Sequence, residues 1–458
     1  MLLTLKLFNM KYLKYEKYRD SGIEWLGEIP SNWKAKKLKY VADLSVSNVD
    51  KKTYDEQRQV RLVNYTDVYY NDFIHSKLEY MVSSASDEEI RKFHVKVGDV
   101  IITKDSESAD DIGIPAFVVE TAPDMVCGYH LSLIRCKPSE MIGGFLFRCF
   151  QSSFLSKQFE IIANGVTRYG LPKSGSKSVL LPVPSITEQK SIANFLDKEV
   201  SRLDTLIEKK QQFIERLKEK RLAVITNAVT KGIDAKVELK PSGIEWLGDI
   251  PSHWDIKKLR YLGTLQNGIS QSAEYFGSGH PFISYGDVYN NLVIPKSGSG
   301  LANSTFEDQI NYSVEEGDIF FTRTSETVEE IGFAATCLNS IEKAVFSGFL
   351  IRFRPFKNRL FSGFSKYQFR NQLLRAFFVG EMNIVTRASL GQNILKNLPV
   401  LIPPFKEQEV ISEFLDREVR KIEKIIKYTG DTIIRLKEYK TSLISAAVTG
   451  KIKVTEPS

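Results

Sequence analysis

Two short segments of the sequence place a cation and a hydroxyl side chain directly after an apolar run. Lys104-Asp-Ser106 follows the run at 100–103, and Arg323-Thr-Ser325 follows the run at 319–322. Lysine, arginine and hydroxyl side chains bind phosphate oxygens, and arginine also binds the edge of a guanine through two hydrogen bonds. The four side chains are therefore candidates for contacts with DNA. Exposed charge without a function is the alternative interpretation.

Five more side chains are candidates of the same kind. Arg168 and Tyr169 lie in a loop with a glycine on each side, and Arg387 lies in a corresponding loop further along the chain. Tyr65 and Tyr285 each open a copy of the motif Tyr-x-Asp-Val-Tyr. Arginine and tyrosine side chains on loops are suited to phosphates and base edges. For Tyr65 and Tyr285, a place in the hydrophobic core is an almost equally good interpretation.

Motifs for catalysis, nucleotide binding and metal binding are missing from the sequence. It contains no G-x-x-x-x-G-K-[ST] phosphate loop, no C-x-x-C pair, and none of the Asn/Asp-Pro-Pro-aromatic strings that amino-methyltransferases carry. The five histidines are isolated, with no metal-binding spacing. Glu208-Lys-Lys210 resembles a nuclease motif but is better explained as a solvated charge run on a helix. We therefore expect no catalytic residue, no metal site and no cofactor in this chain.

Composition sets only broad limits. The chain has 458 residues and a formal net charge of +7, which suits a polyanion ligand without requiring one. No run of 18 apolar residues is present, so no membrane-spanning helix is expected. The scattered cysteines and the lack of a signal peptide favour the cytoplasm. Met10 could serve as the start as well as Met1.

The chain contains two copies of one unit. SGIEWLGEIPSNW, starting at Ser21, recurs as SGIEWLGDIPSHW, starting at Ser242, and these segments hold all four tryptophans. Further along, GDVIIT at 98–103 recurs as GDIFFT at 317–322. Residues 104–160 barely resemble 323–380, although the flanking motifs match. This pattern favours two modules of one fold with different ligands, and drift after duplication is the alternative.

Each copy combines short β-type runs with one long helix. The runs are rich in Val, Ile and Phe and end at Gly, Pro, Asp or Ser, which predicts a globular α+β domain. The long helix of the first copy begins after the prolines at 182 and 184 and continues without Pro or Gly to about residue 227. The tryptophans are interpreted as packing residues.

Apolar residues in the two long helices follow the 4,3 spacing of a coiled coil. Polar residues interrupt both series at matched places, at Lys210 and Arg221 in the first and at Thr429 and Lys440 in the second. Matched interruptions favour pairing of the two helices with each other, because polar seam residues fix the register. We predict an antiparallel coiled coil within the chain; a homodimer coil or a simple hairpin is the alternative. The seams are Leu196, Val200, Leu203, Ile207, Ile214, Leu217, Val224 and Leu415, Val419, Ile422, Ile426, Ile433, Leu436, Leu443.

The predicted fold class is α+β, with two mixed globular domains alternating with two long helices. The expected boundaries are 1–17 for an N-terminal extension, 18–185 for the first domain, 186–232 for the first helix, 233–403 for the second domain, and 404–458 for the second helix and tail.

The repeated motifs resemble those of a known family. The segment SGIEWLGEIPSNWKAKKLKYV, the strings GDVIIT and GDIFFTRTS, and the helices after Pro184 and Pro404 are similar to specificity subunits of Type I restriction–modification enzymes. The resemblance covers the chain after about residue 18, and the family's globular parts are called target-recognition domains.

The resemblance implies a non-catalytic subunit that reads double-stranded DNA. Each domain would read one half of a split, asymmetric site, and the helices would set the gap and dock two methyltransferase subunits. Motor–nuclease subunits would complete an ATP-dependent endonuclease and adenine methyltransferase, with S-adenosylmethionine, ATP and magnesium bound in the partners. A stand-alone DNA-processing enzyme and a coiled-coil interaction protein are the alternatives.

Overall fold

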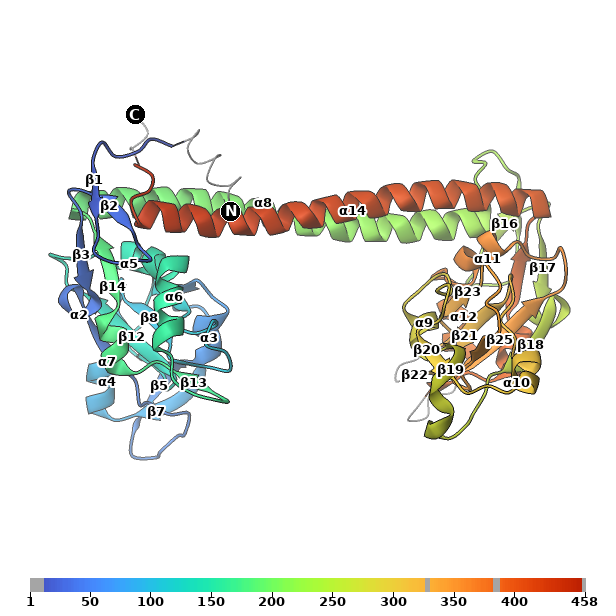
Figure 1. The fold of residues 1–458 in the computed structure, drawn as a ribbon, viewed down its shortest axis with the longest axis horizontal. Coiled ribbons are helices and arrows are strands. Elements are labelled where there is room, and N and C mark those ends of the chain that lie inside the picture. The colour runs from blue at the N-terminus through green and yellow to red at the C-terminus, as the bar shows by residue number, and fades with distance from the viewer. Residues whose placement is uncertain (1–11, 326–329, 382–387, 455–458) are drawn as a thin grey trace. The chain divides into compact units, whose positions relative to one another are not determined.

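The structure is a computed structural model that describes residues 12–325, 330–381 and 388–454. The chain divides into two compact units, Met1–Gln211 with Asp431–Ser458, and Gln212–Gly430. Each unit contains a globular domain of helices and strands together with parts of two long helices, α8 (Ile186–Lys231) and α14 (Phe405–Val448) (Figure 1). The predicted α+β class with two long helices is confirmed. We call the globular part of the first unit domain 1 and that of the second unit domain 2.

The main sheet of domain 1 has five strands, and its central strand is the predicted apolar run. Val100 and Ile102 of that strand face one hydrophobic cluster, whereas Ile101 faces another. Burial on both faces explains why the run is apolar throughout rather than alternating. The strand order is β4 (Ala42–Val46), β12 (Leu131–Cys136), β8 (Val100–Thr103), β10 (Pro115–Val118), β6 (Phe73–Ile74).

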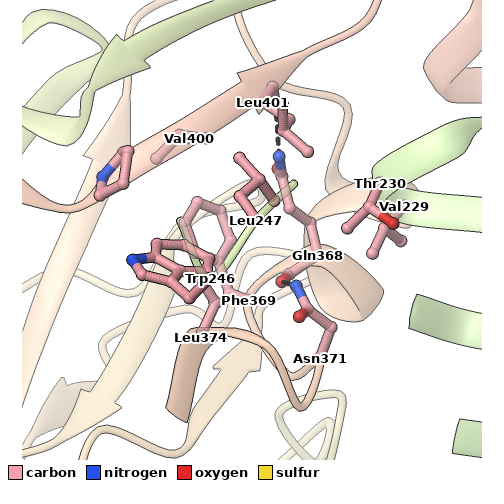
Figure 2. Close-up of a pocket in the computed structure, with 11 residues that line it drawn as sticks. Val229, Thr230, Trp246, Leu247, Gln368, Phe369, Asn371, Leu374, Val400 and Leu401 are labelled. Atoms are coloured by element: carbon pink, nitrogen blue, oxygen red, sulfur yellow. Dashed lines mark hydrogen bonds between the residues drawn. The ribbon is translucent and has the colours of Figure 1, made fainter. Parts of the chain in front are cut away.

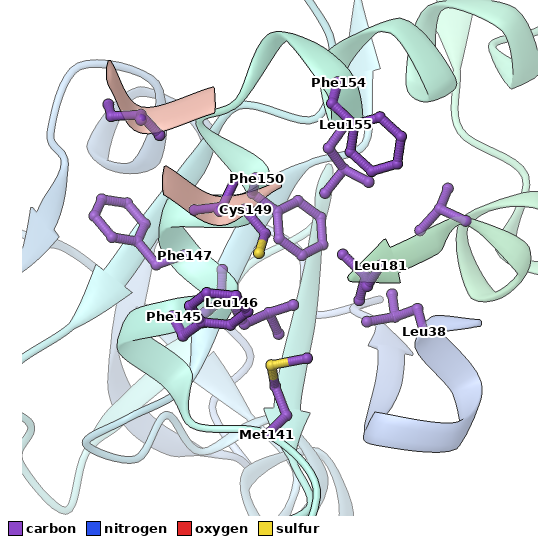
Figure 3. Close-up of a cluster of buried hydrophobic side chains, with 14 of the residues drawn as sticks. Leu38, Met141, Phe145, Leu146, Phe147, Cys149, Phe150, Phe154, Leu155 and Leu181 are labelled. Carbon is purple, nitrogen blue, oxygen red and sulfur yellow. The ribbon is translucent and has the colours of Figure 1, made fainter. Parts of the chain in front are cut away.

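Smaller sheets and short helices complete domain 1. Helix α5 (Gly143–Phe150) is apolar on nearly every side and packs its aromatic rings into the core, as Figure 3 shows. The other strands are β1 (Tyr18–Asp20) with β2 (Glu28–Pro30), β3 (Lys34–Lys37) with β14 (Leu180–Val183), β9 (Asp105–Ser106) with β13 (Tyr169–Gly170), and β11 (Met125–Cys127), β5 (Arg58–Val63), β7 (Met81–Ala85). The other helices are α2 (Leu38–Val41), α3 (Tyr65–Tyr69), α4 (Asp87–Phe93), α6 (Ser153–Ile162) and α7 (Lys173–Ser178).

Domain 2 repeats this plan with a four-stranded main sheet. Leu350 pairs with Thr322 as Leu131 pairs with Thr103 in domain 1, so the strand register is the same. The main sheet is β18 (Gly263–Asn267), β25 (Leu350–Pro355), β21 (Ile319–Thr322), β23 (Ala334–Thr336), and a second sheet is β20 (Gly300–Ala302), β19 (Phe276–Ile283), β24 (Val345–Phe346). The remaining elements are β15 (Leu239–Pro241), β16 (Asp249–Pro251), β17 (Asp255–Lys258), η1 (Leu259–Tyr261), η2 (Ala273–Tyr275), α9 (Tyr285–Tyr289), α10 (Phe306–Asn311), β22 (Thr324–Ser325), α11 (Ser362–Gln368), α12 (Leu374–Glu381), β26 (Ala388–Ser389), α13 (Gln392–Asn397) and β27 (Pro399–Ile402).

The repeated Gly-Asp pair that precedes the central strands is structural. In domain 1, Asp99 is buried and accepts two hydrogen bonds from the guanidinium of Arg135, at 2.8 and 2.6 Å. In domain 2, Asp318 is buried and accepts two from Arg354, both at 2.6 Å. A buried carboxylate is tolerated only when it is paired in this way. The motif therefore stabilises the main sheet of each domain at the point where its central strand begins.

The two long helices pair in an antiparallel arrangement, as predicted. In the first unit, Leu196 and Val200 near the start of α8 share a hydrophobic cluster with Leu443 near the end of α14. In the second unit, Ile225 near the end of α8 shares a cluster with Leu415 near the start of α14. Pairing of a helix start with a helix end, in both units, defines the antiparallel direction.

Two of the four polar interruptions of the seam, Arg221 and Lys440, form ion pairs between the helices. Lys440 Nζ lies 2.7 Å from Asp204 Oδ1 in the first unit, and Arg221 Nη1 lies 3.4 Å from Glu423 Oε1 in the second. These are equivalent pairs, because Lys440 corresponds to Arg221 and Glu423 to Asp204 in the repeat. Each copy thus contributes the cation to one pair and the acid to the other.

A buried glutamine attaches each domain to the helix that follows it. Gln189 accepts a hydrogen bond from the Ile142 amide (2.9 Å) and donates to the carbonyls of Glu140 and Pro184. Gln408 makes the equivalent set, accepting from Phe361 N (2.8 Å) and donating to the carbonyls of Arg359 and Pro403. Both side chains are buried. The repeated Glu-Gln pair of the sequence is therefore a rigid joint.

Domain 2 also contacts the end of α8. Figure 2 shows Val229 and Thr230 of α8 facing Leu247 and Gln368, whose amide donates to the carbonyl of Leu401. The cavity enclosed there is about 20 Å³, which is room for about one water molecule. This junction is a packed contact with no space for a larger ligand.

The four tryptophans do not share one role. Trp33 and Trp254 are fully buried, as expected for packing residues. Trp246 is half-buried against Phe377. Trp25 is 53% exposed, so the packing interpretation is wrong for this residue. Its repeat position is the same as that of Trp246, but the surroundings of the two differ.

Candidate nucleic-acid interface

The end of the central strand of domain 1 gathers all five candidate residues of this domain. Strand β9 pairs with β13, which sets Ser106 opposite Tyr169. The backbone carbonyl of Lys104 accepts from Leu171 N (2.8 Å), which places the Arg168 loop beside it. We call this group tip 1; it consists of Tyr65, Tyr69, Lys104, Asp105, Ser106, Tyr129, His130, Arg168 and Tyr169.

Tyr65 of tip 1 lies on α3 and is half-buried. Its burial is therefore intermediate between that of an exposed DNA contact and that of a core residue, the two interpretations made from the sequence. Its ring stacks on Tyr69 with centroids 5.5 Å apart. Burial raises the pKa of the Tyr65 hydroxyl, as does the charge of Asp111, while a hydrogen bond with Ser106 and the charge of Arg168 act the other way. Tyr69 donates to Asp111 Oδ2 at 2.6 Å, which raises its pKa to about 12. Both phenols therefore stay neutral, and Tyr69 donates its single O–H to Asp111.

A chain of charged and aromatic contacts runs across the rest of tip 1. His130 Nδ1 lies 2.6 Å from Asp105 Oδ2 and 3.3 Å from Nη2 of the exposed Arg168. The Tyr129 ring contacts the His130 ring, with centroids 4.2 Å apart. Lys104 Nζ also contacts the Tyr129 ring and lies 4.4 Å from its centroid. Tyr129 remains 45% exposed. Cations, an imidazole and an aromatic ring are thus presented together at one surface.

Domain 2 gathers an equivalent group, which we call tip 2: Tyr285, Tyr289, Arg323, Thr324, Ser325, Gly348 and Phe349. Tyr285 stacks on Tyr289 with centroids 5.7 Å apart. Burial and the charge of Glu330 raise the pKa of Tyr285, and a hydrogen bond with Thr322 lowers it. Ser325 is buried on β22. Arg387 lies outside the described residues, so its position beside tip 2 stays a prediction.

The two tips have equivalent backbone contacts but different side chains. Lys104 N donates to His130 O, and Arg323 N donates to Phe349 O, each at 2.9 Å. His130 is therefore the structural counterpart of Phe349, which is 63% exposed. Tyr129 corresponds to Gly348, where an added Cβ would lie 2.2 Å from Ser270 Oγ and leave no room for a side chain.

Domain 2 supports its tip with a half-buried arginine, Arg370, at a position where domain 1 has a glutamine. The Arg370 guanidinium donates to the carbonyls of Val288 (3.0 Å), Tyr289 (2.6 Å) and Ala334 (3.2 Å), and burial lowers its pKa. These bonds hold the end of α9, which carries the stacked tyrosines. Gln151 occupies the matched position in domain 1 and donates to Asp72 at 3.2 Å. Arg370 also lines a groove of about 1040 Å³ in the second unit.

Several members of the two tips were not singled out from the sequence. Tyr69 and Tyr289 close the same five-residue motifs that Tyr65 and Tyr285 open, and that position was the available signal. Tyr129 and His130 stand directly before a matched strand, where the copies differ. Within the described residues, no cluster of three or more His, Cys, Asp or Glu could hold a metal ion. No helix in the described part of the chain is long and apolar enough to span a membrane.

Comparison with known proteins identifies the family. The family model for the Type I restriction modification DNA specificity domain matches residues 30–216 and 251–429. The EcoKI specificity subunit of Escherichia coli K12 is 25% identical over 368 residues, covering 77% of this chain and 75% of that protein. The putative MjaX specificity subunit of Methanocaldococcus jannaschii is 22% identical, covering 97% of this chain and 99% of its own length.

Solved structures show the same fold. A chain from a structure of complex assembly and conformational transition in a type I R-M system matches with a TM-score of 0.70 at 15% identity, covering 92% of this chain and 98% of that one. The HsdS subunit from Thermoanaerobacter tengcongensis matches with a TM-score of 0.56 at 16% identity, covering 93% and 98%. With the family model matched in both copies of the repeat, this chain belongs to the Type I restriction–modification specificity subunit family.

Proposed function

We propose that this chain selects a two-part DNA sequence for a Type I restriction–modification complex and is not itself catalytic. Domain 1 reads one half of the site through tip 1, and domain 2 reads the other half through tip 2. The observation that carries the proposal is the equivalent main chain of the two tips with unlike side chains, Lys104 with His130 in one and Arg323 with Phe349 in the other. Two similar but unequal readers select an asymmetric site.

The long helices act as the spacer between the two halves of the site. Helix α8 has 46 residues, which corresponds to about 70 Å at 1.5 Å per residue. This length exceeds one turn of DNA, about 34 Å. The buried joints at Gln189 and Gln408 keep each domain fixed to its own helix, which a spacer of defined length requires.

The helices also dock the methyltransferase subunits, two for each chain. Each unit exposes large apolar side chains on its helical segments, and exposed apolar patches are typical of protein interfaces. They include Leu206 and Ile434 in the first unit and Phe213, Leu222 and Ile425 in the second. Motor–nuclease subunits join this core in the cytoplasm, and S-adenosylmethionine, ATP and magnesium are bound by the partner subunits.

Co-purification with the adenine methyltransferase subunit encoded nearest to its gene tests this function. We expect a stable complex that protects a two-part DNA site and methylates adenine within it. Failure to bind any adenine methyltransferase would contradict the proposal. Magnesium-dependent cleavage by the isolated chain, lost on changing an acidic residue, would favour a stand-alone enzyme. Absent or salt-independent DNA binding would favour an interaction protein, because phosphate contacts weaken with salt.

Insertion of seven residues at matched places in both helices tests the spacer. The gap between the half-sites is expected to lengthen while both half-sites stay the same. A change in the bases recognised, with the gap unchanged, would contradict the role of the helices as a spacer.

A further inference from the structure

His130 holds a backbone conformation that few residues adopt. Its φ is 71°, and the other described non-glycine residues with positive φ are Lys343 and Asn358. The left-handed region is sterically costly for a residue with a Cβ and is retained where the structure needs the side chain there. The position is well defined, because the His130 carbonyl accepts a hydrogen bond from Lys104 N and strand β12 begins at the next residue.

The imidazole of His130 is oriented by an acid. Two side chains contact its Nδ1 atom. Asp105 Oδ2 lies 2.6 Å from Nδ1, and Arg168 Nη2 lies 3.3 Å from it. A ring N–H that donates to the carboxylate cannot also accept from the guanidinium, so the shorter contact assigns the proton to Nδ1. Of the two ring nitrogens, only Nδ1 makes a polar contact with the described residues. Nε2 is then the nitrogen left for a ligand, with an available lone pair.

The neighbours of the imidazole suit a duplex. Lys104 and Arg168 supply positive charge, Tyr129 packs edge-on against the ring, and Asp105 is the acid in direct contact. The two cations are suited to phosphate oxygens and to the edges of bases. The imidazole, with a fixed direction and a single unused nitrogen, is suited to a base edge.

Domain 2 has different residues at three positions of this arrangement. Phe349 replaces His130, Thr324 replaces Asp105, and Gly348 replaces Tyr129. The last change cannot be reversed in place, because Ser270 Oγ and the Ile269 carbonyl fill the space of a side chain. Three concerted differences at an otherwise equivalent main chain point to a ligand contact that belongs to domain 1.

We propose that His130 is a specificity-determining residue of domain 1, whose Nε2 accepts a hydrogen bond from the exocyclic amino group of a base. Adenine N6 and cytosine N4 present such a donor in the major groove. The inference rests on the proposed function, since it assigns one base contact to one of the two readers.

The test uses the complete complex of the chain with its methyltransferase subunits and measures binding to a library that varies each half-site. In His130→Asn, asparagine tolerates positive φ, so the fold is retained while the base contact changes. In His130→Phe, the side chain of domain 2 is copied. We expect both variants to lose about tenfold in discrimination at one position of the first half-site, as for loss of a base contact. Lys343→Asn, at an exposed position of domain 2 with positive φ, is the matched control and should change neither half-site.

Modified bases identify the donor. Replacing the selected adenine by purine, or the selected cytosine by its 4-deamino analogue, should weaken wild-type binding and leave His130→Phe unchanged. Unchanged base preference in both variants would overturn the proposal, as would a uniform loss on random DNA, which marks a phosphate contact. If the wild-type complex selects no two-part site, the proposed function fails and the inference fails with it. If the complex selects one and the variants read it unchanged, only the inference fails.

Discussion

Tip 1 and tip 2 show how a duplicated domain separates what must be kept from what can change. The strand register and the carbonyl contacts of His130 and Phe349 are the same in both tips. Tip 1 combines a His–Asp pair with two cations, whereas tip 2 places an exposed Phe349 beside Arg323. The conserved part consists of buried backbone bonds, whose loss affects folding. The variable part consists of side chains at the strand ends, where a change alters the ligand and leaves the sheet intact.

The largest expected effect tests whether the two frameworks are equivalent. Arg354→Met leaves the carboxylate of Asp318 buried without its partner, and Arg135→Met does the same to Asp99. Removal of one partner of a buried ion pair costs about 3 to 5 kcal/mol. Amide hydrogen exchange in β21 and β8 should show this loss in the domain that carries the substitution.

The exposed pair of Arg58 and Asp87, 3.4 Å apart, provides the control. Arg58→Met should change stability by less than about 1 kcal/mol. If Arg354→Met were no more disruptive than this control, the Gly-Asp motif would have no structural role in the sheet.

The next effect concerns the joints between domains and helices. Gln189→Leu and Gln408→Leu each remove hydrogen bonds from buried backbone groups, which costs about 1 to 3 kcal/mol per unsatisfied group. The amides of Ile142 and Phe361 should exchange faster in the respective variants, and the complex should tolerate a wider range of gaps between half-sites. Gln211→Leu, on the exposed surface of α8, should show neither change. Unchanged exchange in both joint variants would contradict the rigid attachment.

A smaller effect separates the two readers. Lys104→Ala should weaken binding to the first half-site about tenfold, and Arg323→Ala should weaken the second by a similar factor, as expected for one polar contact to DNA. Competition with DNA in which one half-site is scrambled measures each effect. Equal weakening on random DNA would identify the residue as a phosphate contact. Weakening of the opposite half-site would contradict the assignment of tips to halves.

The smallest effect tests the equivalence of the helical ion pairs. Lys440→Met and Arg221→Met should each cost at most about 1 kcal/mol, because the pairs are partly exposed. Reversal of the first pair, with Lys440→Glu and Asp204→Lys together, should restore stability relative to Lys440→Glu alone. Thermal unfolding of the complex measures both. A reversed pair no more stable than the single variant would mean that the contact does not fix the register.

The sequence was sufficient for features that depend on periodicity or repetition. The seam positions and their matched interruptions predicted that the two helices pair, since a helical period is visible along one chain. The placement of one helix after each globular domain favoured the antiparallel direction. The sequence was insufficient for contacts between distant loops. The contact of His130 with Asp105 requires that the ends of β8 and β12 meet, and the role of Gly348 depends on Ser270, 78 positions earlier in the chain.

Tyr65 shows the intermediate case. The repeat identified the motif, but whether its first ring is buried, exposed or stacked on Tyr69 depends on how α3 packs against the sheet. For Trp25, a matched position in the repeat was misleading, because the partner that half-buries Trp246 is Phe377 of domain 2. Repetition therefore predicts the main chain better than it predicts the environment of an individual side chain.

The most direct measurement is the DNA sequence selected from a random library by a complex in which residues 251–402 are replaced by 30–183. With two identical readers on antiparallel helices, the selected site should change from two unlike half-sites to an inverted repeat of the first half-site. The gap should stay the same, since the helices are unchanged. Continued selection of the original asymmetric site would contradict the assignment of one half-site to each domain.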